Sequence, residues 1–274
     1  MKIYLRVLTL AVLLSVTAIA AELRVATLNC YLCFDPAVDH PGKIDDENRM
    51  TPQQYQSKIT NLASLAKDSD FVGLEEMGGR DEVEALAAET GFEWAFAQGK
   101  DTYTGENVAG LYRLPGWKVT VNGRVAALDK VLSKHLLVTA KKGSETVRFL
   151  VIHLLRPIGN NEAKHQGQLS AIRTWADEVF RLEPASTIVV LGDTNDTKTV
   201  AGSSLLGEGR EANELTGFAA THLDGHPYDR LIVLGVGSWA AAEIVRPPYP
   251  KRPNNDTKRV WTDHYLLTGR LALP

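Results

Sequence analysis

The chain has 274 residues, of which 44% are hydrophobic and 23% charged, and these proportions exclude a disordered or collagen-like protein. Thirty Lys and Arg residues against 33 Asp and Glu residues give a net charge of -3. No overall positive field would therefore hold nucleic acid or an anionic membrane through charge alone, although a local patch with a metal ion could. Two cysteines exclude a disulfide-rich scaffold, and no Cys/His array has zinc-finger spacing.

The N-terminal segment has the features of a cleaved signal peptide, which we expect to cover residues 1–20. Lys2 and Arg6 come first, and a mostly apolar run of 14 residues, 7–20, ends in a small-x-small pattern. This run is shorter than the roughly 20 residues of a membrane-spanning helix, which argues against a permanent anchor. We expect the mature chain, residues 21–274, to be secreted or periplasmic, to have no stable membrane anchor and to be a monomer.

A C-x-x-C pair, Cys30 and Cys33, follows the first predicted strand. In an oxidising compartment such a pair can close a small disulfide or act in redox chemistry. The surrounding sequence has no other feature of a thioredoxin-like enzyme. A structural disulfide and two unpaired thiols are both better interpretations than redox catalysis, and the sequence does not choose between them.

The mature chain begins with a predicted strand, a loop and a helix. Residues 22–29 alternate apolar and polar side chains as a strand does, and the acidic segment 30–50 is predicted to be a surface loop. Thr51 and Gln54 form a capping-box pattern around Pro52, which suits the first helical position. The helix that follows has one apolar stripe, formed by Tyr55, Ile59, Leu62 and Ala66.

The rest of the chain mixes short strands with two more helices. A helix at residues 81–89 ends at Gly91, and a longer amphipathic helix at 162–182 ends before Pro184. Residues 187–191 are wholly apolar, as in a strand buried on both faces. The other predicted strands are 70–74, 92–97, 107–112, 117–121, 135–140, 146–153, 231–234, 239–244 and 264–271. Without a linker or an internal repeat, this pattern predicts one α/β domain with mixed sheets.

Acidic, amide and histidine side chains gather where these strands begin or end, and a rigid sheet holds such groups at one rim. Asn29, Glu76 and Asp263 offer hard oxygen ligands, which suit Mg²⁺, Mn²⁺ or Ca²⁺ better than zinc. His153 and His264, with carboxylates nearby, suit acid–base catalysis near neutral pH. Metal, acid and base together predict the hydrolysis of a phosphate ester.

Six segments occur in the order that is found in the endonuclease/exonuclease/phosphatase superfamily: LRVATLN, VGLEEM, VIHL, VVLGDTND, YDRLIVLG and WTDHYLL. The chain resembles this superfamily, which includes pancreatic-type deoxyribonucleases, abasic-site endonucleases, bacterial sphingomyelinases and inositol-polyphosphate 5-phosphatases. The resemblance spans residues 23–267, essentially the whole mature chain. It implies a single-domain, four-layer α/β sandwich, in which two mixed β-sheets pack face to face with helices outside.

The resemblance implies a metal site for Mg²⁺, with Mn²⁺ or Ca²⁺ as alternatives, held by Asn29, Glu76 and Asp263. Glu75 stands where the family usually has Gln, so the metal is assigned to the second glutamate of the pair. The last of these ligands belongs to a Thr-Asp-His sequence that matches the terminal Ser-Asp-His motif of the family, with Thr262 in place of Ser.

The resemblance also implies six catalytic residues: Glu106, His153, Asp193, Asn195, Asp229 and His264. Asp193 and Asn195 match the Gly-Asp-x-Asn pair, which orients the attacking water and the phosphate. Asp229 resembles the carboxylate that pairs with His264, and this histidine would contact the phosphate or activate water. His153 matches the second acid–base histidine of the deoxyribonuclease-like branch. In that branch a glutamate supports the histidine, and Glu106 is the candidate for this role.

The loops around such a core decide its substrate. Similarity at residues 106–113 and 228–230 favours a deoxyribonuclease or sphingomyelinase type. Residues 239–242 are the one candidate for a membrane-binding hairpin, and they fit a buried strand better. A nucleic-acid groove could use the basic residues Arg156, Arg246, Lys251 and Arg252. We predict an exported, metal-dependent, nuclease-like phosphodiesterase that uses in-line attack of water. The alternatives are a phosphomonoesterase, a sphingomyelinase-type lipid phosphodiesterase and a non-enzymatic binding protein.

The remaining histidines lack motif neighbours, and we expect surface or structural roles for His40, His135, His165, His222 and His226. The basic segment 246–259 is predicted to be a solvated loop just before the last motif, where it could also contact a polyanion.

Overall fold

The computed structural model describes residues 22–37, 49–101, 104–196, 212–214, 220–249 and 254–274. The predicted signal peptide, His40, Lys251 and Arg252 lie outside the described residues, as does most of the predicted loop 30–50. Within the described ranges, none of the helices combines the length and apolar character needed to cross a membrane.

The first sheet has six strands in the order β11-β12-β1-β2-β4-β3. Strands β1 and β2 are parallel, and the other neighbouring strands are antiparallel, so the sheet is mixed as predicted. Its strands are β1 (Glu22–Cys33), β2 (Phe71–Met77), β3 (Glu93–Ala97), β4 (Asn107–Tyr112), β11 (Ser238–Val245) and β12 (Leu266–Ala272).

The second sheet also has six strands, in the order β5-β6-β7-β8-β10-β9. It is mixed too, because β7 and β8 are parallel while their other neighbours are antiparallel. Its strands are β5 (Lys118–Gly123), β6 (His135–Lys142), β7 (Glu145–His153), β8 (Thr187–Asp193), β9 (Ala212–Glu214) and β10 (Asp229–Gly235).

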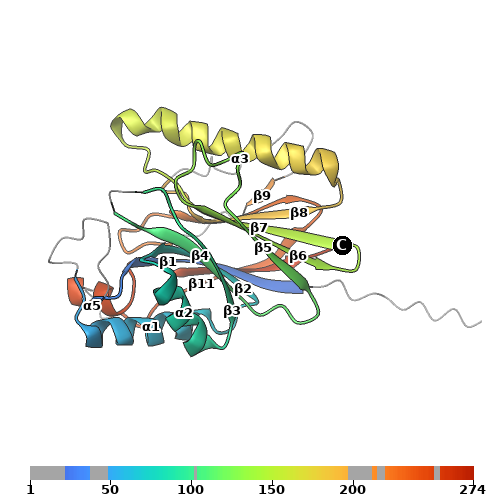
Figure 1. Ribbon diagram of the computed structural model, residues 1–274. Coiled ribbons are helices and arrows are strands. Elements are labelled where there is room, and N and C mark those ends of the chain that lie inside the picture. Colours follow the sequence, from blue (N-terminus) through green and yellow to red (C-terminus); the bar gives the residue numbers. More distant parts are fainter. Residues whose placement is uncertain (1–21, 38–48, 102–103, 197–211, 215–219, 250–253) are drawn as a thin grey trace, which may run out of the picture.

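Helices cover the outer faces of the two sheets and complete four layers (Figure 1). The helices α1 (Pro52–Ala66) and α2 (Arg80–Thr90) pack on the first sheet, and α3 (Glu162–Leu182) packs on the second. A 3-10 turn, Gly159–Asn161, precedes α3, and a short helix, α5 (Asn255–Val260), lies next to α1. The prediction of a four-layer α/β sandwich is confirmed.

Apolar side chains fill the space between the two sheets and join them into one core. The rings of Phe71 on β2 and Phe149 on β7 stack with their centroids 4.0 Å apart. Leu191 of β8 reaches across to Gly73 of β2, where a side chain would collide with it. Each fully buried apolar side chain contributes about 1.5–3 kcal/mol to folding, so this core holds the strand ends in fixed positions.

The predicted start of α1 is confirmed in detail. Thr51 Oγ1 accepts a hydrogen bond from the backbone N–H of Gln54 at 3.2 Å, and Gln54 Oε1 accepts one from the N–H of Thr51 at 2.8 Å. These two bonds satisfy donors that the first helical turn leaves free, and Pro52 lacks such a donor. Helix α2 ends as predicted, with Gly91 in the left-handed conformation at φ 70°.

Strand β1 continues to Cys33, although the sequence predicted a loop from residue 30 onward. Tyr31 and Leu32 both have φ 48°, and the pairing with β2 shifts there, so the extra length is a bulged strand end. The segment is polar, as loops usually are, so the sequence did not predict a bulged strand end there. Cys30 and Cys33 are both buried free thiols in this structure. Of the two alternatives left open by the sequence, a structural disulfide and two unpaired thiols, the structure has the unpaired thiols.

Three other segments differ from the prediction. Residues 239–242 were predicted to form a buried strand. They belong to β11, which is only partly buried because it lies at the edge of the described sheet and pairs on one side only. The predicted loop 246–259 contains α5, whose N-cap Asn254 forms a capping box with Thr257. The last strand begins at Leu266 and not at His264, because His264 forms only an isolated bridge to His222.

Candidate metal-dependent active site

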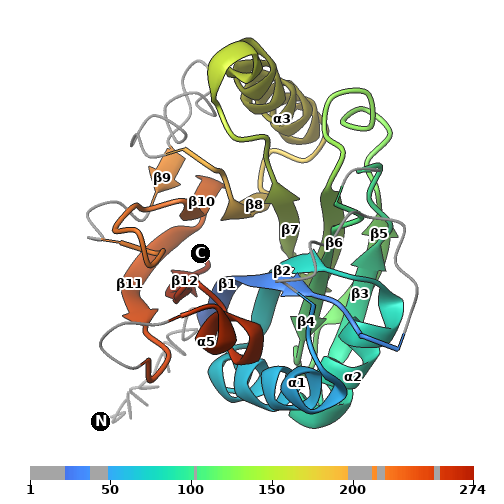
Figure 2. The ribbon, with the colours of Figure 1, turned by 90° about the vertical axis from the view of Figure 1, so that its left-hand side faces the viewer.

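The register of the second sheet places three predicted catalytic residues in one row. His153 at the end of β7 pairs with Asp193 on β8, and Asp193 pairs with Asp229 on β10. In the first sheet, Asn29 pairs with Glu75 near the end of β1. Figure 2 looks toward this rim, where β1 of one sheet and β7 and β8 of the other come close together. The sandwich therefore brings distant motifs to a single edge.

The turn after β8 explains the Gly-Asp-x-Asn sequence. Gly192 has φ 137°, and a Cβ there would collide with the carbonyl oxygen of Ile152. Asn195 also has a positive φ, 54°, a conformation that non-glycine residues adopt at a cost and that clusters at functional sites. The backbone N–H of Asn195 donates to Asp193 Oδ1 at 2.6 Å, and its side chain donates to the carbonyl of Leu154 at 2.9 Å. The turn thus fixes both side chains of the motif.

His264 forms a close pair with Asp229. Its Nδ1 lies 2.8 Å from Asp229 Oδ2, and its Nε2 lies 3.9 Å from Asp193 Oδ2. Burial disfavours the imidazolium, but the carboxylates of Asp229 and Asp193 outweigh burial and hold the pKa of His264 well above its ordinary value. The hydroxyl of Thr262 accepts from the N–H of His264 at 3.1 Å and donates to the carbonyl of Asn29 at 2.6 Å.

His153 faces Asp193 from the other side, with 3.8 Å between Nε2 and Asp193 Oδ2. Burial, with the positive charges of Lys134 and His264, holds the pKa of His153 well below its ordinary value. The predicted support from Glu106 is not a hydrogen bond, because Glu106 Oε2 lies 3.8 Å from His153 Nδ1 and instead accepts from Lys134 Nζ at 2.7 Å. Lys134 lies outside every motif, so no sequence pattern pointed to it.

Glu76 presents both carboxylate oxygens to the rim from a backbone with φ 57°. Its Oε1 accepts from Asn29 Nδ2 at 2.9 Å, and its Oε2 accepts from the N–H of Leu32 at 3.0 Å. Burial and the nearby negative charge of Asp263 raise the pKa of Glu76. A divalent cation would relieve both effects, because it stabilises the ionised carboxylates.

Asn29 links the two sheets through its amide. Its Nδ2 donates to Glu76 Oε1 and also to Asp193 Oδ2, the latter at 3.1 Å. Its Oδ1 accepts from the N–H of Tyr31 at 2.9 Å, so the predicted metal ligation would use the second lone pair of this oxygen. Asn29 therefore orients two carboxylates of the rim, whichever ligands the metal takes.

Glu75 differs from its neighbour Glu76 in position. It is fully buried, and its Oε1 accepts from the hydroxyl of Thr27 at 2.9 Å. Burial and the negative charges of Asp229 and Asp193 raise the pKa of Glu75 well above its usual range. Glu75 is thus turned into the core and toward Thr27, whereas Glu76 presents its carboxylate to the rim.

The rim carries the donors that a hard divalent cation requires. Atoms of Glu76, His153 and Asp193 lie within 4.8 Å of one another. Asp263 Oδ1 is buried and, among the described residues, has no hydrogen-bond partner. Buried carboxylates need a cation or hydrogen bonds, so this set of side chains fits a metal such as Mg²⁺.

His222, for which the sequence predicted only a surface or structural role, also lies at this rim. Its Nε2 lies 3.3 Å from Asp263 Oδ2, and its ring centroid lies 4.6 Å from that of His264. Lys258 of α5 donates to the same Asp263 oxygen at 3.2 Å. No motif points to His222, because a loop and not a strand end delivers it.

Two of the basic residues predicted for a substrate groove, Arg156 and Arg246, contact tyrosines near the rim. Arg156 lies over the ring of Tyr228, with 5.9 Å to its centroid, and donates to the Tyr228 hydroxyl at 3.4 Å. Arg246 lies 5.2 Å from the ring centroid of Tyr265, directly after His264. Two of the four basic residues predicted for a substrate groove are thus close to the catalytic set.

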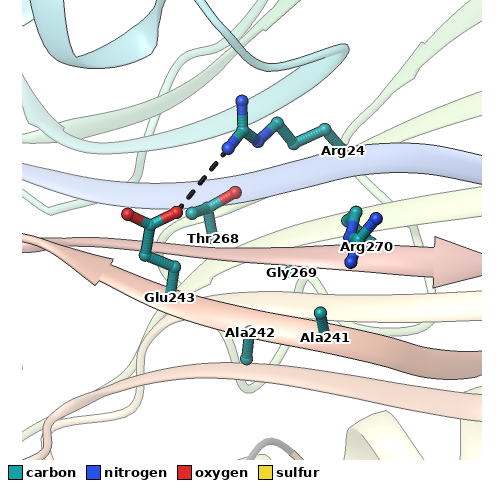
Figure 3. A pocket seen from close by; sticks show the side chains of 7 residues that line it. All are labelled: Arg24, Ala241, Ala242, Glu243, Thr268, Gly269 and Arg270. Carbon is teal, nitrogen blue, oxygen red and sulfur yellow. Dashed lines mark ion pairs between the residues drawn. The ribbon is translucent and has the colours of Figure 1, made fainter.

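A separate hollow of about 460 Å³ lies on β11, β12 and β1, away from these residues (Figure 3). Its lining residues are Arg24, Ala241, Ala242, Glu243, Thr268, Gly269 and Arg270. Arg24 lies five residues before Asn29 on β1, which in an extended strand is about 16 Å away. Its guanidinium pairs with Glu243 at 3.6 Å. None of the predicted catalytic or metal-binding residues lines this hollow.

Comparisons with known proteins give structural matches only: no protein-family model matches the chain, and no curated protein gives a significant match. An endonuclease/exonuclease/phosphatase protein from Bacteroides vulgatus is 16% identical, with a TM-score of 0.61, over 93% of this chain and 100% of that one.

Two further solved structures are similar over comparable lengths. TDP2 from D. rerio, complexed with a single-strand DNA product, is 11% identical with a TM-score of 0.62, over 92% of this chain and 99% of that one. A mannosyl-6-phosphatase from Bacteroides thetaiotaomicron is 14% identical with a TM-score of 0.62, over 92% and 100%. Together with the two packed mixed sheets, these matches identify the fold of this chain as that of the endonuclease/exonuclease/phosphatase superfamily.

Proposed function

We propose that this chain is a metal-dependent phosphoesterase that hydrolyses phosphodiester bonds in a nuclease-like reaction. The observation that carries the proposal is the position of Asp193, which lies between two histidines with opposite pKa shifts and is joined to Glu76 through Asn29. Neighbouring groups whose environments push their pKa values apart are typical of acid–base pairs in enzymes.

The metal would be held by the carboxylates of Glu76 and Asp263, with Asn29 as the third predicted ligand. Mg²⁺ is the expected ion, with Mn²⁺ or Ca²⁺ as alternatives, and when bound it would polarise a phosphoryl oxygen and neutralise developing charge. Asn29 contributes in addition by fixing the carboxylates of Glu76 and Asp193 relative to each other.

Asp193 and Asn195 would orient the attacking water. Burial raises the pKa of Asp193 to about 6, so its carboxylate can accept a proton near neutral pH. His264, held as a cation by Asp229, would stabilise the negative charge that builds up on the phosphoryl group. Neutral His153 lies on the opposite side of Asp193, where it can accept or relay a proton.

The substrate class is proposed from the neighbouring structures and from the basic residues. One structural neighbour is a TDP2 complexed with a single-strand DNA product, and another is a mannosyl-6-phosphatase, so diesters and monoesters are both candidates on this fold. Arg156 and Arg246 lie next to tyrosines near the rim, as side chains that contact nucleic-acid phosphates and bases often do. This arrangement favours a nucleic-acid-like diester, which would be met outside the cell or in the periplasm if residues 1–20 direct export.

The test compares initial rates on a chromogenic phosphate diester and on the matching monoester. The protein would start at Ala21 and would be assayed with Mg²⁺ and with a chelator. The proposal predicts a metal-dependent preference for the diester. A preference for the monoester would move the function to a phosphomonoesterase, which is the second candidate because of the mannosyl-6-phosphatase neighbour. No metal-dependent turnover of either compound would contradict the proposal and favour a binding protein.

A further inference from the structure

We infer that His222, Asp263 and His264 form a second cation site, one that binds a transition-metal ion of the Zn²⁺ or Co²⁺ class beside the site proposed for Mg²⁺. One ligand atom from each residue lies within 4.8 Å of the others. The inference deepens the proposed function: Asp263 belongs to both sites, and an ion on His264 Nε2 would replace the proton there and supply the positive charge that the proposed reaction assigns to His264. Binding of the ion can be measured without any turnover.

The distances fit a tetrahedral ion after small movements of the side chains. His222 Nε2 lies 3.3 Å from Asp263 Oδ2, and His264 Nε2 lies 3.9 Å from Asp263 Oδ1. Ligands about 2.0–2.2 Å from a tetrahedral zinc ion are about 3.3–3.6 Å apart from one another. Two imidazoles and one carboxylate are also the protein ligands of many zinc enzymes, in which the fourth position stays open.

Each of the two histidines is supported by its own carboxylate. His264 Nδ1 lies 2.8 Å from Asp229 Oδ2, and His222 Nδ1 lies 2.8 Å from Asp224 Oδ1. Metal-binding histidines almost always use their second ring nitrogen in this way, because the carboxylate fixes the tautomer and the direction of the ring. Asp224 is itself held by the hydroxyl of Tyr228 at 2.9 Å. The backbone N–H of Asp224 also approaches His222 Nδ1, at 3.1 Å, so Asp224 holds this ring through two atoms, and Nε2 of both histidines faces Asp263.

The charges around the cluster are suited to a divalent ion. Asp224, Asp229 and Asp263 contribute three carboxylates, and Lys258 Nζ, 3.2 Å from Asp263 Oδ2, is a cation already drawn to this place. The side chain of Lys258 is 26% exposed, so it can turn toward solvent when an ion binds. The side chain of Asp263 is only 8% exposed, and its buried Oδ1 lacks a hydrogen-bond partner among the described residues, which leaves a ligand atom available for the ion.

The two sites differ in ligand chemistry. Oxygen atoms dominate around Glu76 and Asp193, which favours Mg²⁺, whereas the cluster at His222 offers two imidazole nitrogens, which favour later transition metals. Co²⁺ is therefore a suitable probe, because its visible absorption becomes intense when nitrogen ligands hold it with a low coordination number.

The experiment titrates metal-free protein with Co²⁺ alone and follows the visible absorption and the number of ions bound. We expect one absorbing ion in the wild type and at least about tenfold weaker binding of it in His222→Ala. Asp224→Asn should weaken the same ion about tenfold, as the loss of a supporting carboxylate usually does. The matched control is His226→Ala, because His226 is an exposed imidazole from the same loop whose ring is not part of the cluster.

Glu76→Gln separates the two sites, because the absorbing ion should remain when the proposed Mg²⁺ site is weakened. Loss of the absorbing ion in Glu76→Gln but not in His222→Ala would overturn the inference and place the ion in the first site. Equal binding by the wild type and His222→Ala would overturn it as well. Thermal unfolding of each variant shows whether it is folded, and Asp224→Asn tests the inference independently if His222→Ala is not. Absence of phosphoesterase activity would contradict the proposed function and leave the Co²⁺ result intact.

Discussion

Two regions of this protein bury histidines, and the closest partners of these histidines differ. At the rim, His264, which precedes β12 of the first sheet, pairs with the carboxylate of Asp229 at 2.8 Å. In the second sheet and the helix that covers it, His135 Nε2 accepts the backbone N–H of Val125 at 2.9 Å, and His165 Nδ1 lies 2.7 Å from the backbone carbonyl of Leu155. Carboxylate oxygens of Asp129 and Asp196 lie farther off, 3.7 Å from Nε2 of His135 and of His165. All three imidazoles are almost completely shielded from solvent.

The pKa shifts show what the difference in partner does. Burial and the nearby Arg124 lower the pKa of His135 to about 4, whereas carboxylates raise that of His264 well above its ordinary value despite equal burial. At His135, burial and Arg124 outweigh the carboxylate of Asp129, whereas at His264 the carboxylate of Asp229, within hydrogen-bond distance, helps to outweigh burial. The rim contains several such partners, which is why we assign chemistry to the rim and a structural role to His135 and His165.

The largest expected effect is at the rim itself. Asp193→Asn and Glu76→Gln should each lower turnover at least about a hundredfold, because they remove the proton acceptor and a metal ligand. The measurement is kcat on the best substrate at saturating Mg²⁺, and His135→Gln serves as a buried control outside the proposed catalytic set. Wild-type activity in both rim variants would show that the rim is not catalytic.

The structural region should show its effect in stability. His135 has a pKa of about 4 in the folded protein and about 6.5 when unfolded, so only the unfolded chain takes up a proton between these values. Proton uptake by His135 in the unfolded chain should therefore lower the free energy of unfolding by about 2 kcal/mol when the pH falls from 7 to 5. We expect the unfolding free energy of His135→Gln, measured by urea denaturation, to fall less steeply with acid than that of the wild type. Parallel pH profiles would contradict the assigned pKa.

Substitution within the pair of Asp229 and His264 should lower turnover by an intermediate amount. Asp229→Asn keeps the shape of the side chain but removes the charge that holds His264 protonated, so kcat should fall about tenfold or more with a smaller change in KM. Glu178→Gln on the exposed face of α3 is the matched control for the loss of one carboxylate. An unchanged kcat in Asp229→Asn would mean that the cation at His264 has no role in the reaction.

The smallest effect concerns the thiols next to Asn29. Burial raises the pKa of Cys30 and Cys33, the latter to about 12, so neither should react with a thiol reagent in the native protein at neutral pH. Two thiols should react after denaturation without a reducing agent, because both are free in the structure. Finding none in the denatured protein would show a disulfide instead.

Much of this molecule could be predicted from local patterns. The capping box at Thr51 and the apolar strand β8 were readable because they reflect local backbone chemistry and burial, and the succession of helices and strands predicted one α/β domain with mixed sheets. The four-layer sandwich followed from the resemblance of six motifs to a known superfamily. The same patterns placed Asp193 and His153 at strand ends, where the sheet register brings them together.

Long-range contacts could not be predicted in this way. His222 reaches Asp263 from a loop, and Lys134 takes Glu106 away from His153, and both contacts depend on the packing of segments far apart in the sequence. The bulge after Asn29 was missed as well, because its polar residues are typical of a loop while its cysteines are buried in the core.

The most direct test of the account compares two buried histidines in one assay. His264→Gln and His135→Gln would be assayed with Mg²⁺ on the chromogenic diester, after thermal unfolding has shown that both are folded. We expect His264→Gln to lose at least about a hundredfold in kcat/KM, while His135→Gln stays within about threefold of the wild type. If both variants were equally active, the carboxylates at the rim would not make it the catalytic centre.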